Sequence, residues 1–434
     1  MTSDQEEGRR SSDGAPEDQP PTPLPPVVIQ KYGGTSIATP ERICAIADRI
    51  ARRLPDDPRM VIVLSAMGKT TDQLVALAHD VAARPQGREM DLLLATGEQV
   101  SVSLLGLALQ DRGIAAVSLT AGQCGIRTDD AFNIARIQSI DTGRIRRELD
   151  SGRVVIITGF QGISSTEEIT TLGRGGSDIT GAAVAVALGA TACEICTDVD
   201  GVFTADPALV PGARMWREIS YEESIELASS GAKVLHPRAA EVCMAYGVPI
   251  HVRSSFKASE GTWIRRKEDM VMEQAAVVGV SSDKKIAKVT LIDVPDQPGV
   301  AAQVFQSLAA EDLSVRLIIQ SASSDGRGRI TLVLEDAFAD QVAGLAERWQ
   351  QDGLATRSLV EHNVATISIV GSRLASTPGL AARMFRALSE EGINIDCISS
   401  SEMKISCVIG SERLEHAVKS VHDEFFPETE SPAR

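Results

Sequence analysis

The sequence predicts an α/β protein in which a mainly parallel β-sheet lies between two layers of helices, followed by two smaller α/β units. First, short apolar runs alternate with longer helical stretches from Val27 to about Ser255. Second, glycine-containing turns follow several of these runs. Third, residues 296–321 resemble residues 376–401, which indicates an internal repeat. Alternating buried strands and helices are typical of βαβ units, whose parallel sheet is covered by helices on both faces.

The composition argues against several classes of protein. The chain of 434 residues is 43% hydrophobic and 24% charged, and charged residues interrupt every apolar run before it could cross a bilayer. A net charge of −16 and an aromatic content of 3% argue against binding to nucleic acid or to an anionic membrane. Seven scattered cysteines favour a reducing compartment, so we expect a cytoplasmic protein.

Residues 1–26 are predicted to form a disordered tail. They are rich in Pro, Ser, Asp and Glu, and they contain no apolar segment of the kind found in signal peptides.

Residues 27–265 are predicted to form the larger domain. Its expected strands are the apolar runs at 27–30, 60–65, 115–120, 153–160, 193–199 and 248–253. Helices are expected between them, for example at 41–54 and 179–189. Ligands of such sheets bind beyond the carboxyl ends of the strands, and the turns "KYGG", "SAMGKTT" and "GFQG" fall at those ends.

Two ferredoxin-like units are expected after a charged linker at 265–269, the first over 270–355 and the second over 356–426. The two copies of the repeat are offset by 80 residues. Each copy is predicted to form a strand, a Pro-Gly turn, an amphipathic helix and a second strand, which is half of a βαββαβ unit. Such a pair can share a sheet and form a ligand crevice between its members. The alternative is a duplicated oligomerisation module that binds no ligand.

The stretch "QKYGGTSIATPERI" at 30–43 places Lys31 before Gly33 and Gly34. A Walker A loop has its lysine after the glycines, so this order excludes that family of NTPases. Glycines after a buried strand still allow backbone N–H groups to approach an anion. Taken by itself, the stretch favours an ordinary strand-to-helix turn over an anion site.

The stretch "TTLGRGGSD" at 170–178 precedes an alanine-rich helical pattern. Ser177 or Asp178 could cap that helix, and the glycines leave room for a ligand to approach. A capped turn does not need Arg174 between two glycines. Because a guanidinium matches a carboxylate in shape and charge, this pattern favours a site for a small carboxylic acid.

Two further loops contain charged residues. "TDVDGVFTADP" at 197–207 is dense in acids but lacks the glycine and terminal glutamate of a calcium loop. "GAKVLHP" at 231–237 supplies Lys233, and His236 beside a proline favours a structural role. Cys193 and Cys196 lie three apart in an expected strand and therefore face opposite sides, which argues against a metal or redox pair.

Taken together, these stretches resemble the aspartate kinases of the amino-acid kinase family. "KYGGTS", "SAMGKTTD", "GEQVS", "GFQG", "TTLGRGGSD", "CEICTDVDGVFTADP", "ELASSGAKVLHPRA" and "VPIHVRSS" occur in the order of that family. The duplicated unit resembles its paired ACT domains, with "DQPGVAA" and "SSSEMKIS" as similar segments. The resemblance extends from Val27 to about Phe426.

The resemblance implies transfer of the γ-phosphoryl group of ATP to the β-carboxylate of L-aspartate, with Mg²⁺ carried by the ATP phosphates rather than held by the protein. By similarity, the catalytic residues are Lys31, Asp178 and Lys233. The resemblance implies that ATP contacts Lys31, Gly33, Gly34, Ser65, Thr197, Asp198, Phe203, Asp206, Lys233 and Val234. It implies that aspartate contacts Thr71, Glu98, Arg174, Gly175, Gly176 and Ser177, with Glu98 on the ammonium and Arg174 on the α-carboxylate.

The ACT resemblance implies an amino-acid effector, with lysine or threonine the usual choice. Its implied contacts are Asp296, Gln297, Gly299, Ala301, Gln320, Ser323, Asn394 and Ile395. A homo-oligomer is expected, or an assembly with a shorter ACT-only chain that starts near Met272. The sequence departs from the family pattern at Ala208, Phe203 and Cys196 in the kinase part, and at Arg316 and Ser321 in the first repeat.

Two rival functions remain at this stage. Other amino-acid kinases phosphorylate glutamate, acetylglutamate, carbamate or UMP on the same fold. A non-catalytic amino-acid sensor could also keep the kinase fold as a scaffold. Lys31, Asp178 and Lys233 argue against the sensor, and "TTLGRGGSD" with Glu98 and the ACT pair favours aspartate.

Overall fold

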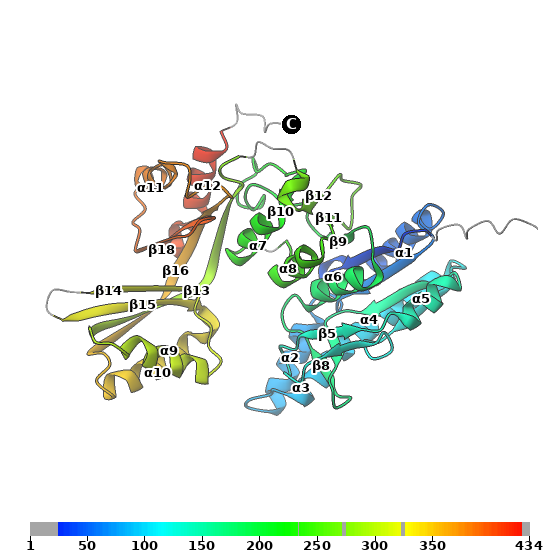
Figure 1. Ribbon diagram of the computed structural model, residues 1–434, viewed down its shortest axis with the longest axis horizontal. Coiled ribbons are helices and arrows are strands. Elements are labelled where there is room, and N and C mark those ends of the chain that lie inside the picture. Colours follow the sequence, from blue (N-terminus) through cyan, green and yellow to red (C-terminus); the bar gives the residue numbers. More distant parts are fainter. Residues whose placement is uncertain (1–24, 233, 271–274, 323–325, 428–434) are drawn as a thin grey trace, which may run out of the picture.

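The computed structural model describes residues 25–232, 234–270, 275–322 and 326–427. Most of the predicted tail and three predicted residues, Lys233, Met272 and Ser323, therefore lie outside the described residues. Figure 1 shows two parts, which we name after the resemblance: the kinase part with β1–β12 lies on the right, and the ACT part from β13 onward lies on the left.

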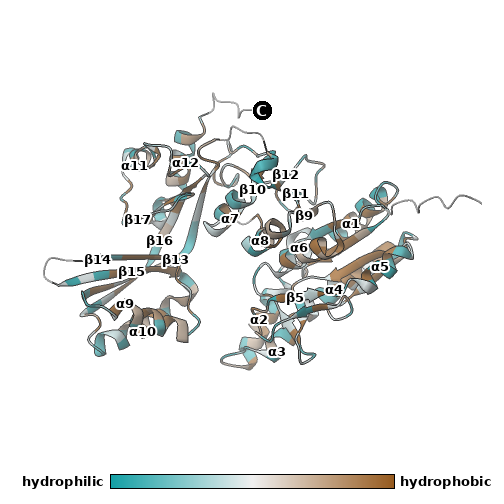
Figure 2. Cartoon of the chain, in the orientation of Figure 1, coloured by the Kyte–Doolittle hydropathy of each residue, from teal (hydrophilic) through white to brown (hydrophobic). Residues whose placement is uncertain are grey.

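An eight-stranded sheet forms the centre of the kinase part, in the order β10-β12-β11-β9-β1-β2-β6-β3. Its strands are β1 (Val28–Tyr32), β2 (Met60–Leu64), β3 (Ala116–Leu119), β6 (Val154–Thr158), β9 (Cys193–Thr197), β10 (Glu218–Ser220), β11 (Ile250–Ser254) and β12 (Thr262–Arg265). All neighbours are parallel except β11 and β12. The six predicted strands all occur in this sheet, and they are coloured as largely hydrophobic in Figure 2.

Helices cover both faces of the sheet, which confirms the predicted three-layer sandwich. On one face lie α1 (Pro40–Arg53) and α4 (Thr96–Asp111), and their apolar side chains pack with Val28 and Tyr32 of β1. On the other face lie α5 (Gly143–Asp150), α6 (Gly176–Leu188), α7 (Tyr221–Ser229) and α8 (Pro237–Tyr246), which pack with alternate strand residues such as Ile29. Successive strand residues point to opposite faces, so Lys31 lies on the α6 face.

A second, four-stranded sheet was not predicted. It contains β4 (Ile126–Thr128), β5 (Ile137–Ile140), β7 (Gln161–Ile163) and β8 (Ile169–Thr171), in the order β5-β4-β7-β8. Helix α3 (Arg88–Leu94) packs beside β8, and α2 (Thr70–Val81) packs against α3. The run Arg88–Asp111, which joins α3 to α4, is long and apolar enough to cross a bilayer by length and composition, but half of its most apolar window is buried inside the protein.

The ACT part is built on one six-stranded sheet, in the order β14-β15-β13-β16-β18-β17. Its strands are β13 (Gly279–Pro295), β14 (Leu317–Ala322), β15 (Arg327–Glu335), β16 (Arg357–Val370), β17 (Cys397–Ser400) and β18 (Lys404–Gly410). Its helices are α9 (Val300–Ala310), α10 (Ala339–Gln351), α11 (Leu380–Glu390) and α12 (Leu414–Phe425). The repeat is visible in space, because 311–320 and 391–400 have the same pattern of buried and exposed residues.

The long strands β13 and β16 each contribute to two units, which we call unit 1 and unit 2. Unit 1 comprises 286–295 of β13, α9, β14, β15, α10 and the first residues of β16, with one apolar core. Unit 2 comprises 279–283 of β13, 364–370 of β16, α11, β17, β18 and α12, with a separate core. The sheet is thus continuous across the predicted boundary at 355–356, and the first strand of unit 2 precedes unit 1 in the chain.

Candidate active site

Four neighbouring strands end at the same level, and their carboxyl ends form the rim of the sheet where the site is predicted. Tyr32 of β1 pairs with Leu64 of β2 and Cys196 of β9, and Leu64 pairs with Thr158 of β6. Main-chain bonds continue past the strands, from Ser65 N–H to Tyr32 O at 3.2 Å and from Gly159 N–H to Leu64 O at 2.9 Å. The predicted residues Gly33, Ser65 and Thr197 therefore sit side by side at one edge.

Lys31 and Asp178 form an ion pair at this edge. Lys31 Nζ lies 2.5 Å from Asp178 Oδ1, and each side chain is 12% exposed. Asp178 is in the first turn of α6, where the helix dipole favours a carboxylate. Gly181 of the same helix lets α6 approach β1, since a Cβ there would lie 3.2 Å from Lys31 Cβ. The pair joins a strand and a helix that are about 150 residues apart in the chain.

The other oxygen of Asp178 accepts a hydrogen bond from the backbone N–H of His236, at 3.2 Å. His236 is the N-cap residue of α8, so this bond brings the segment that carries Val234 against α6. The half-buried imidazole has a lowered pKa because partial burial disfavours its charged form. The structural role expected for His236 thus fits its position, and Lys233 itself lies outside the described residues.

The loop before α6 places Arg174 at the surface. Arg174 is exposed and has no hydrogen-bond or ion-pair partner within the described part of the chain. Gly175 has φ +69°, and a Cβ there would lie 2.3 Å from the His236 ring. Ser177 is buried against Gly159, where a Cβ would lie 2.7 Å from its hydroxyl. An unpaired guanidinium beside closely packed glycines suits a carboxylate ligand.

Phe160 is a residue that sequence reasoning missed. It has φ +70°, a conformation that is rare for a bulky side chain and that marks strain at functional sites. Its N–H donates to Thr180 Oγ1 at 3.1 Å, and its carbonyl accepts from Leu172 N–H at 2.8 Å. A Cβ on Gly176 would lie 2.7 Å from its ring. Phe160 therefore fixes the loop beside the first turn of α6, and its position between glycines in "TGFQG" was the available signal.

Glu98 lies buried at the same rim, in the first turn of α4. It is 2% exposed, and its Oε1 accepts a hydrogen bond from Ala66 N–H at 2.9 Å. Its Oε2 is buried and has no hydrogen-bond partner in the described structure. Burial raises the pKa of this carboxyl from 4.5 to about 8. An uncompensated buried carboxyl is costly, so the site is suited to a cationic ligand group.

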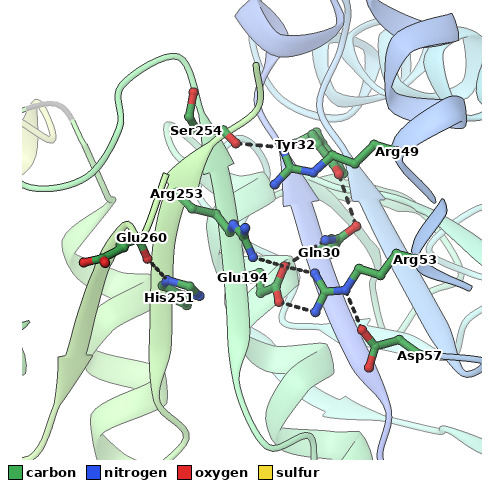
Figure 3. A network of polar contacts seen from close by, with 10 residues as sticks. All are labelled: Gln30, Tyr32, Arg49, Arg53, Asp57, Glu194, His251, Arg253, Ser254 and Glu260. Atoms are coloured by element: carbon green, nitrogen blue, oxygen red, sulfur yellow. Dashed lines mark hydrogen bonds and ion pairs between the residues drawn. The ribbon is translucent and has the colours of Figure 1, made fainter. Parts of the chain in front are cut away.

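Behind Lys31, a buried polar network fixes the neighbouring residues of β1 (Figure 3). Gln30 Nε2 donates to Glu194 Oε2 at 2.8 Å, and Tyr32 OH donates to Gln30 Oε1 at 3.1 Å. Arg53 of α1 binds both Glu194 oxygens at 2.6 Å. Desolvation raises the pKa of Glu194, but the hydrogen bonds and charge of Arg53 outweigh it and the net shift is downward. This network ties α1 to β1 and β9 on the face opposite Lys31.

The remaining predicted aspartate and nucleotide residues lie around this rim or on the loop after β9. Thr71 is half-buried near the start of α2, and Gly68 just before that helix donates to Gly34 O at 3.0 Å. Thr197 Oγ1 donates to Asp198 Oδ1 at 3.1 Å. Phe203 forms an isolated bridge with Met215, and exposed Asp206 accepts from Ala208 N–H at 2.9 Å.

The loop that carries Phe203 and Asp206 is also packed against unit 2 of the ACT part. Thr204 Oγ1 and His422 Nε2 of α12 are 2.9 Å apart, and Val280 N–H donates to Thr204 O at 2.7 Å. Ala205 and Val210 belong to the apolar core of unit 2. A second link joins Lys404 of β18 to Glu226 of α7 at 2.6 Å. The loop after β9 is therefore shared by both parts of the protein.

The predicted effector residues fall into two groups that one chain does not bring together. Asp296, Gln297, Gly299, Ala301 and Gln320 belong to unit 1, whereas Asn394 and Ile395 precede β17 in unit 2. Strands β14 and β17 are the opposite edges of the sheet. A cavity of about 660 Å³ lies beside Asn394 and is bordered by Glu361, Asp396 and Glu412, among others.

Arg316, which replaces the acid of the family pattern, is accommodated by two carboxylates. It binds Asp283 of β13 and, at 3.1 Å, Glu335 of β15. In unit 2 the polarity is reversed, since Asp396 binds Lys288 of β13 at 2.9 Å. The described residues contain no group of three or more His, Cys, Asp or Glu side chains that could hold a metal ion.

Comparisons with known proteins cover almost the whole chain. Residues 26–254 match the amino acid kinase family, and residues 288–353 and 367–425 each match an ACT domain. The chain is 45% identical to an aspartokinase of Thermus thermophilus over 92% of this chain and 98% of the relative. It is 44% identical to aspartokinase 2 of Bacillus subtilis, over 92% and 97% of the two chains.

Solved structures give the same picture. The crystal structure of E. coli aspartokinase III in complex with aspartate and ADP (R-state) superposes with a TM-score of 0.77 at 27% identity, covering 92% of this chain and all of that one. The same enzyme in complex with lysine and aspartate (T-state) gives a TM-score of 0.70 at 26% identity, covering 92% and 99% of the two chains.

Proposed function

This chain belongs to the aspartokinase branch of the amino acid kinase family, and from this premise we propose that it phosphorylates the β-carboxylate of L-aspartate with MgATP. A carboxylate oxygen attacks the γ-phosphorus, an O–P bond forms, the β–γ bridging bond breaks, and ADP leaves. The carboxylate is already ionised at neutral pH, so no proton has to be removed. The products are 4-phospho-L-aspartate and ADP, the first step toward the aspartate-derived amino acids lysine, threonine and methionine.

The observation that carries this proposal is the set of charges at one rim: the Lys31–Asp178 pair, the unpaired Arg174 and the buried Glu98. Phosphoryl transfer needs alignment and charge neutralisation more than covalent chemistry. The ammonium of Lys31, which is held by its ion pair with Asp178, neutralises the β- and γ-phosphates. Backbone N–H groups of Gly33 and Gly34 hold the same phosphates, and Lys233 adds a second positive charge.

Aspartate is a zwitterion with two carboxylates, and the rim offers a complementary group for each end. Arg174 binds the α-carboxylate, and Glu98 binds the ammonium, whose charge replaces the missing partner of Oε2. Thr71, Gly175, Gly176 and Ser177 orient the β-carboxylate toward the phosphates. A nucleotide-associated metal accompanies such kinases, and we assign it as Mg²⁺ carried by the ATP phosphates. When bound with ATP, the ion would supply positive charge that offsets the charge of the phosphates.

The nucleotide base and ribose are assigned to the loop after β9 and to the segment before α8. Ser65, Thr197, Asp198, Phe203, Asp206 and Val234 line this side. Family members usually have an arginine at the position of Ala208, and that exposed alanine therefore weakens the nucleotide contact without removing a catalytic charge.

The test is a hydroxamate assay, which traps an acyl phosphate, with ATP and either aspartate or glutamate. Aspartate-dependent hydroxamate and ADP in equal amounts support the proposal, and Arg174→Lys, which keeps the charge but loses the planar fork, is expected to raise the KM for aspartate. Activity with glutamate alone would assign a sister reaction. No hydroxamate with either substrate would favour a non-catalytic sensor.

We further propose that a second copy of the chain completes each effector site. The two groups of effector residues lie at opposite sheet edges, and a two-fold axis would bring the β14 edge of one copy to the β17 edge of the other. Ile318 and Ile398 occupy equivalent positions on these edges and are 51% and 47% exposed. Exposed apolar edge strands favour pairing with another chain. The effector is a small amino acid such as lysine or threonine.

Calorimetric titration with lysine and threonine, singly and together, tests this assignment. Binding by the wild type that is lost with Ile398→Glu, together with a lower molar mass, would support an intersubunit site. We also propose a cytoplasmic location and an internal start near Met272. The proposed domain limits are 27–265 for the kinase domain and 270–355 and 356–426 for the two ACT repeats, with the strand at 279–283 contributed to the second repeat. Intact-mass analysis of protein from the native gene would reveal or exclude the shorter chain.

A further inference from the structure

Asp91 of α3 is a buried carboxyl group that has no role in the proposed function so far. It is fully buried, and it has no ion-pair partner in the described part of the chain. Donors from two residues converge on it instead. Thr171 donates from its N–H at 2.8 Å and from Oγ1 at 2.6 Å, and Asn133 donates from its N–H at 2.9 Å and from Nδ2. A carboxylate has about four acceptor positions, so these donors use its full capacity.

The two residues that Asp91 binds belong to segments far apart in the chain. Thr171 is the last residue of β8, and Arg174 follows three residues later. Asn133 lies in the loop 129–136 between β4 and β5, with a φ of +67° that Asn tolerates better than most residues. Its side-chain Oδ1 also accepts from Gly87 N–H at 2.9 Å. Asp91 therefore joins the end of β8 to this loop.

The loop 129–136 packs directly against the turn that presents Arg174. Ala135 N–H donates to Thr171 O at 2.9 Å. Gly173 has φ +77°, and a Cβ there would lie 3.1 Å from the carbonyl oxygen of Asn133. The backbone just before Arg174 is therefore fixed, although the Arg174 side chain itself is exposed.

Asp91 is also linked to Glu98, the second charge of the proposed aspartate site. The run Arg88–Asp111 is one helical segment, because Ala95 between α3 and α4 has helical backbone angles. Asp91 and Glu98 are seven residues apart, so they lie on the same side of this run and about 10 Å apart along its axis. The same helical run therefore presents Glu98 and, through Asp91, holds the turn that carries Arg174.

We propose that Asp91 is a positioning residue that sets the distance between Arg174 and Glu98, and this inference rests on their proposed binding of the aspartate zwitterion. A buried carboxylate without a counter-ion is costly, and an apolar side chain could pack α3 against β8 without that cost. A buried polar group with all its hydrogen bonds made fixes one geometry instead. A substrate with charges at both ends depends on that geometry, since a shift of about 1 Å can lower the rate ~100-fold.

Steady-state kinetics of two variants of the full-length chain test this role. Asn133→Gly removes the side chain that binds Asp91 and keeps a residue that adopts positive φ readily. It is expected to lower kcat/KM for aspartate about tenfold, the effect of one lost hydrogen bond to a charged group, and to leave the KM for ATP unchanged. Asp91→Asn turns an amide N–H toward the donors and should lower kcat/KM for aspartate ~100-fold.

A double-mutant cycle separates positioning from general stability. Because Asp91 acts through Arg174, Asn133→Gly should have little further effect on kcat/KM for aspartate in an Arg174→Lys background. Thr128→Val is the matched control, because it breaks a buried hydrogen bond of 2.6 Å to Thr170 in the same four-stranded sheet. Its Tm should fall while its kinetic constants stay as in the wild type.

The outcomes distinguish this inference from the proposed function. An unchanged KM for aspartate in Asn133→Gly, equal losses for aspartate and ATP, or an additive cycle would overturn the role of Asp91 and leave the proposed function intact. A wild type without aspartate-dependent activity would overturn both. If Asp91→Asn does not fold, Asn133→Gly decides the result by itself.

Discussion

Replacing Glu98 by glutamine isolates the effect of one buried charge. Glu98 is 2% exposed, and its pKa is raised from 4.5 to about 8 because burial disfavours the carboxylate. Between these pH values the folded state binds a proton that the unfolded state releases. The free energy of unfolding of the wild type must therefore fall as pH rises from 4.5 to 8. Glutamine keeps the acceptor for Ala66 N–H and does not titrate.

The magnitude follows from the size of the shift. Between the two pKa values, each pH unit lowers the free energy of unfolding of the wild type by up to about 1.36 kcal/mol. The wild type should therefore lose about 3 kcal/mol of stability relative to Glu98→Gln between pH 5 and pH 8. For a kinase part of this size, 1 kcal/mol corresponds to about 2–4 °C in Tm. The Tm of Glu98→Gln minus that of the wild type should thus increase by about 6–12 °C from pH 5 to pH 8.

Kinetics of the same variant test the assignment of Glu98 to the ammonium of aspartate. A hydrogen bond to a charged group contributes about 1.5–3 kcal/mol, so the KM for aspartate should rise about 10- to 100-fold. The wild-type KM should fall as pH rises through 8, because the bound ammonium favours the ionised carboxylate. Glu98→Gln should lack this pH dependence.

Scanning fluorimetry at constant protein concentration, with steady-state kinetics at each pH, supplies both measurements. Glu223→Gln is the control, since Glu223 is also buried but belongs to the capping box of α7, where glutamine is equally suitable. It should leave the KM for aspartate unchanged. A Tm difference that is constant across pH would refute the reasoning about burial, and an unchanged KM would refute the role in binding.

Three further changes test the rim and its supports. Asp178→Asn leaves Lys31 without its ion pair, and kcat should fall about 100- to 1,000-fold with little change in Tm; stopped-flow measurement of ADP release checks this. Gly175→Ala places a methyl group against the His236 ring at a positive φ, so Tm and kcat should both fall, whereas an unaltered kcat would contradict the packing argument. Thr204→Val removes the hydroxyl that contacts His422 and accepts from Arg214 N–H, and it should cost about 1–3 kcal/mol while raising the KM for ATP but not for aspartate. An equal change in both KM values would argue against a local role for that loop.

The large sheet and the rim at which the candidate residues gather could be predicted from the sequence, for a physical reason. Strands that are buried on both faces appear in the sequence as continuous apolar runs. Because neighbouring parallel strands end at the same level, the glycine turns that follow them lie together at one rim of the sheet. The four-stranded sheet was missed because strands such as Gln161–Ile163 are too short to show a period of two.

Features that depend on distant contacts could not be read from the sequence. The strained backbone of Phe160 and the fit of His236 against Gly175 arise only when the loop before α6 meets the segment before α8. The separation of Asp296 from Asn394 follows from the strand order, because the repeat alone does not reveal which edges are free. The compensation of Arg316 by Asp283 likewise requires β13 to lie next to β15, one strand away from β14.

The interleaving of β13 and β16 restricts how this chain can be divided. Residues 279–283 supply a strand to unit 2, whose other elements all lie after residue 363. No cut between the two repeats therefore gives two fragments that each contain a complete unit. A fragment that begins after Asp283 would lack that strand, and one that ends at Gln351 would leave β13 without its neighbour β16. A gene fusion or truncation that preserves the regulatory part must therefore keep the whole segment from just before Gly279 to the end of α12.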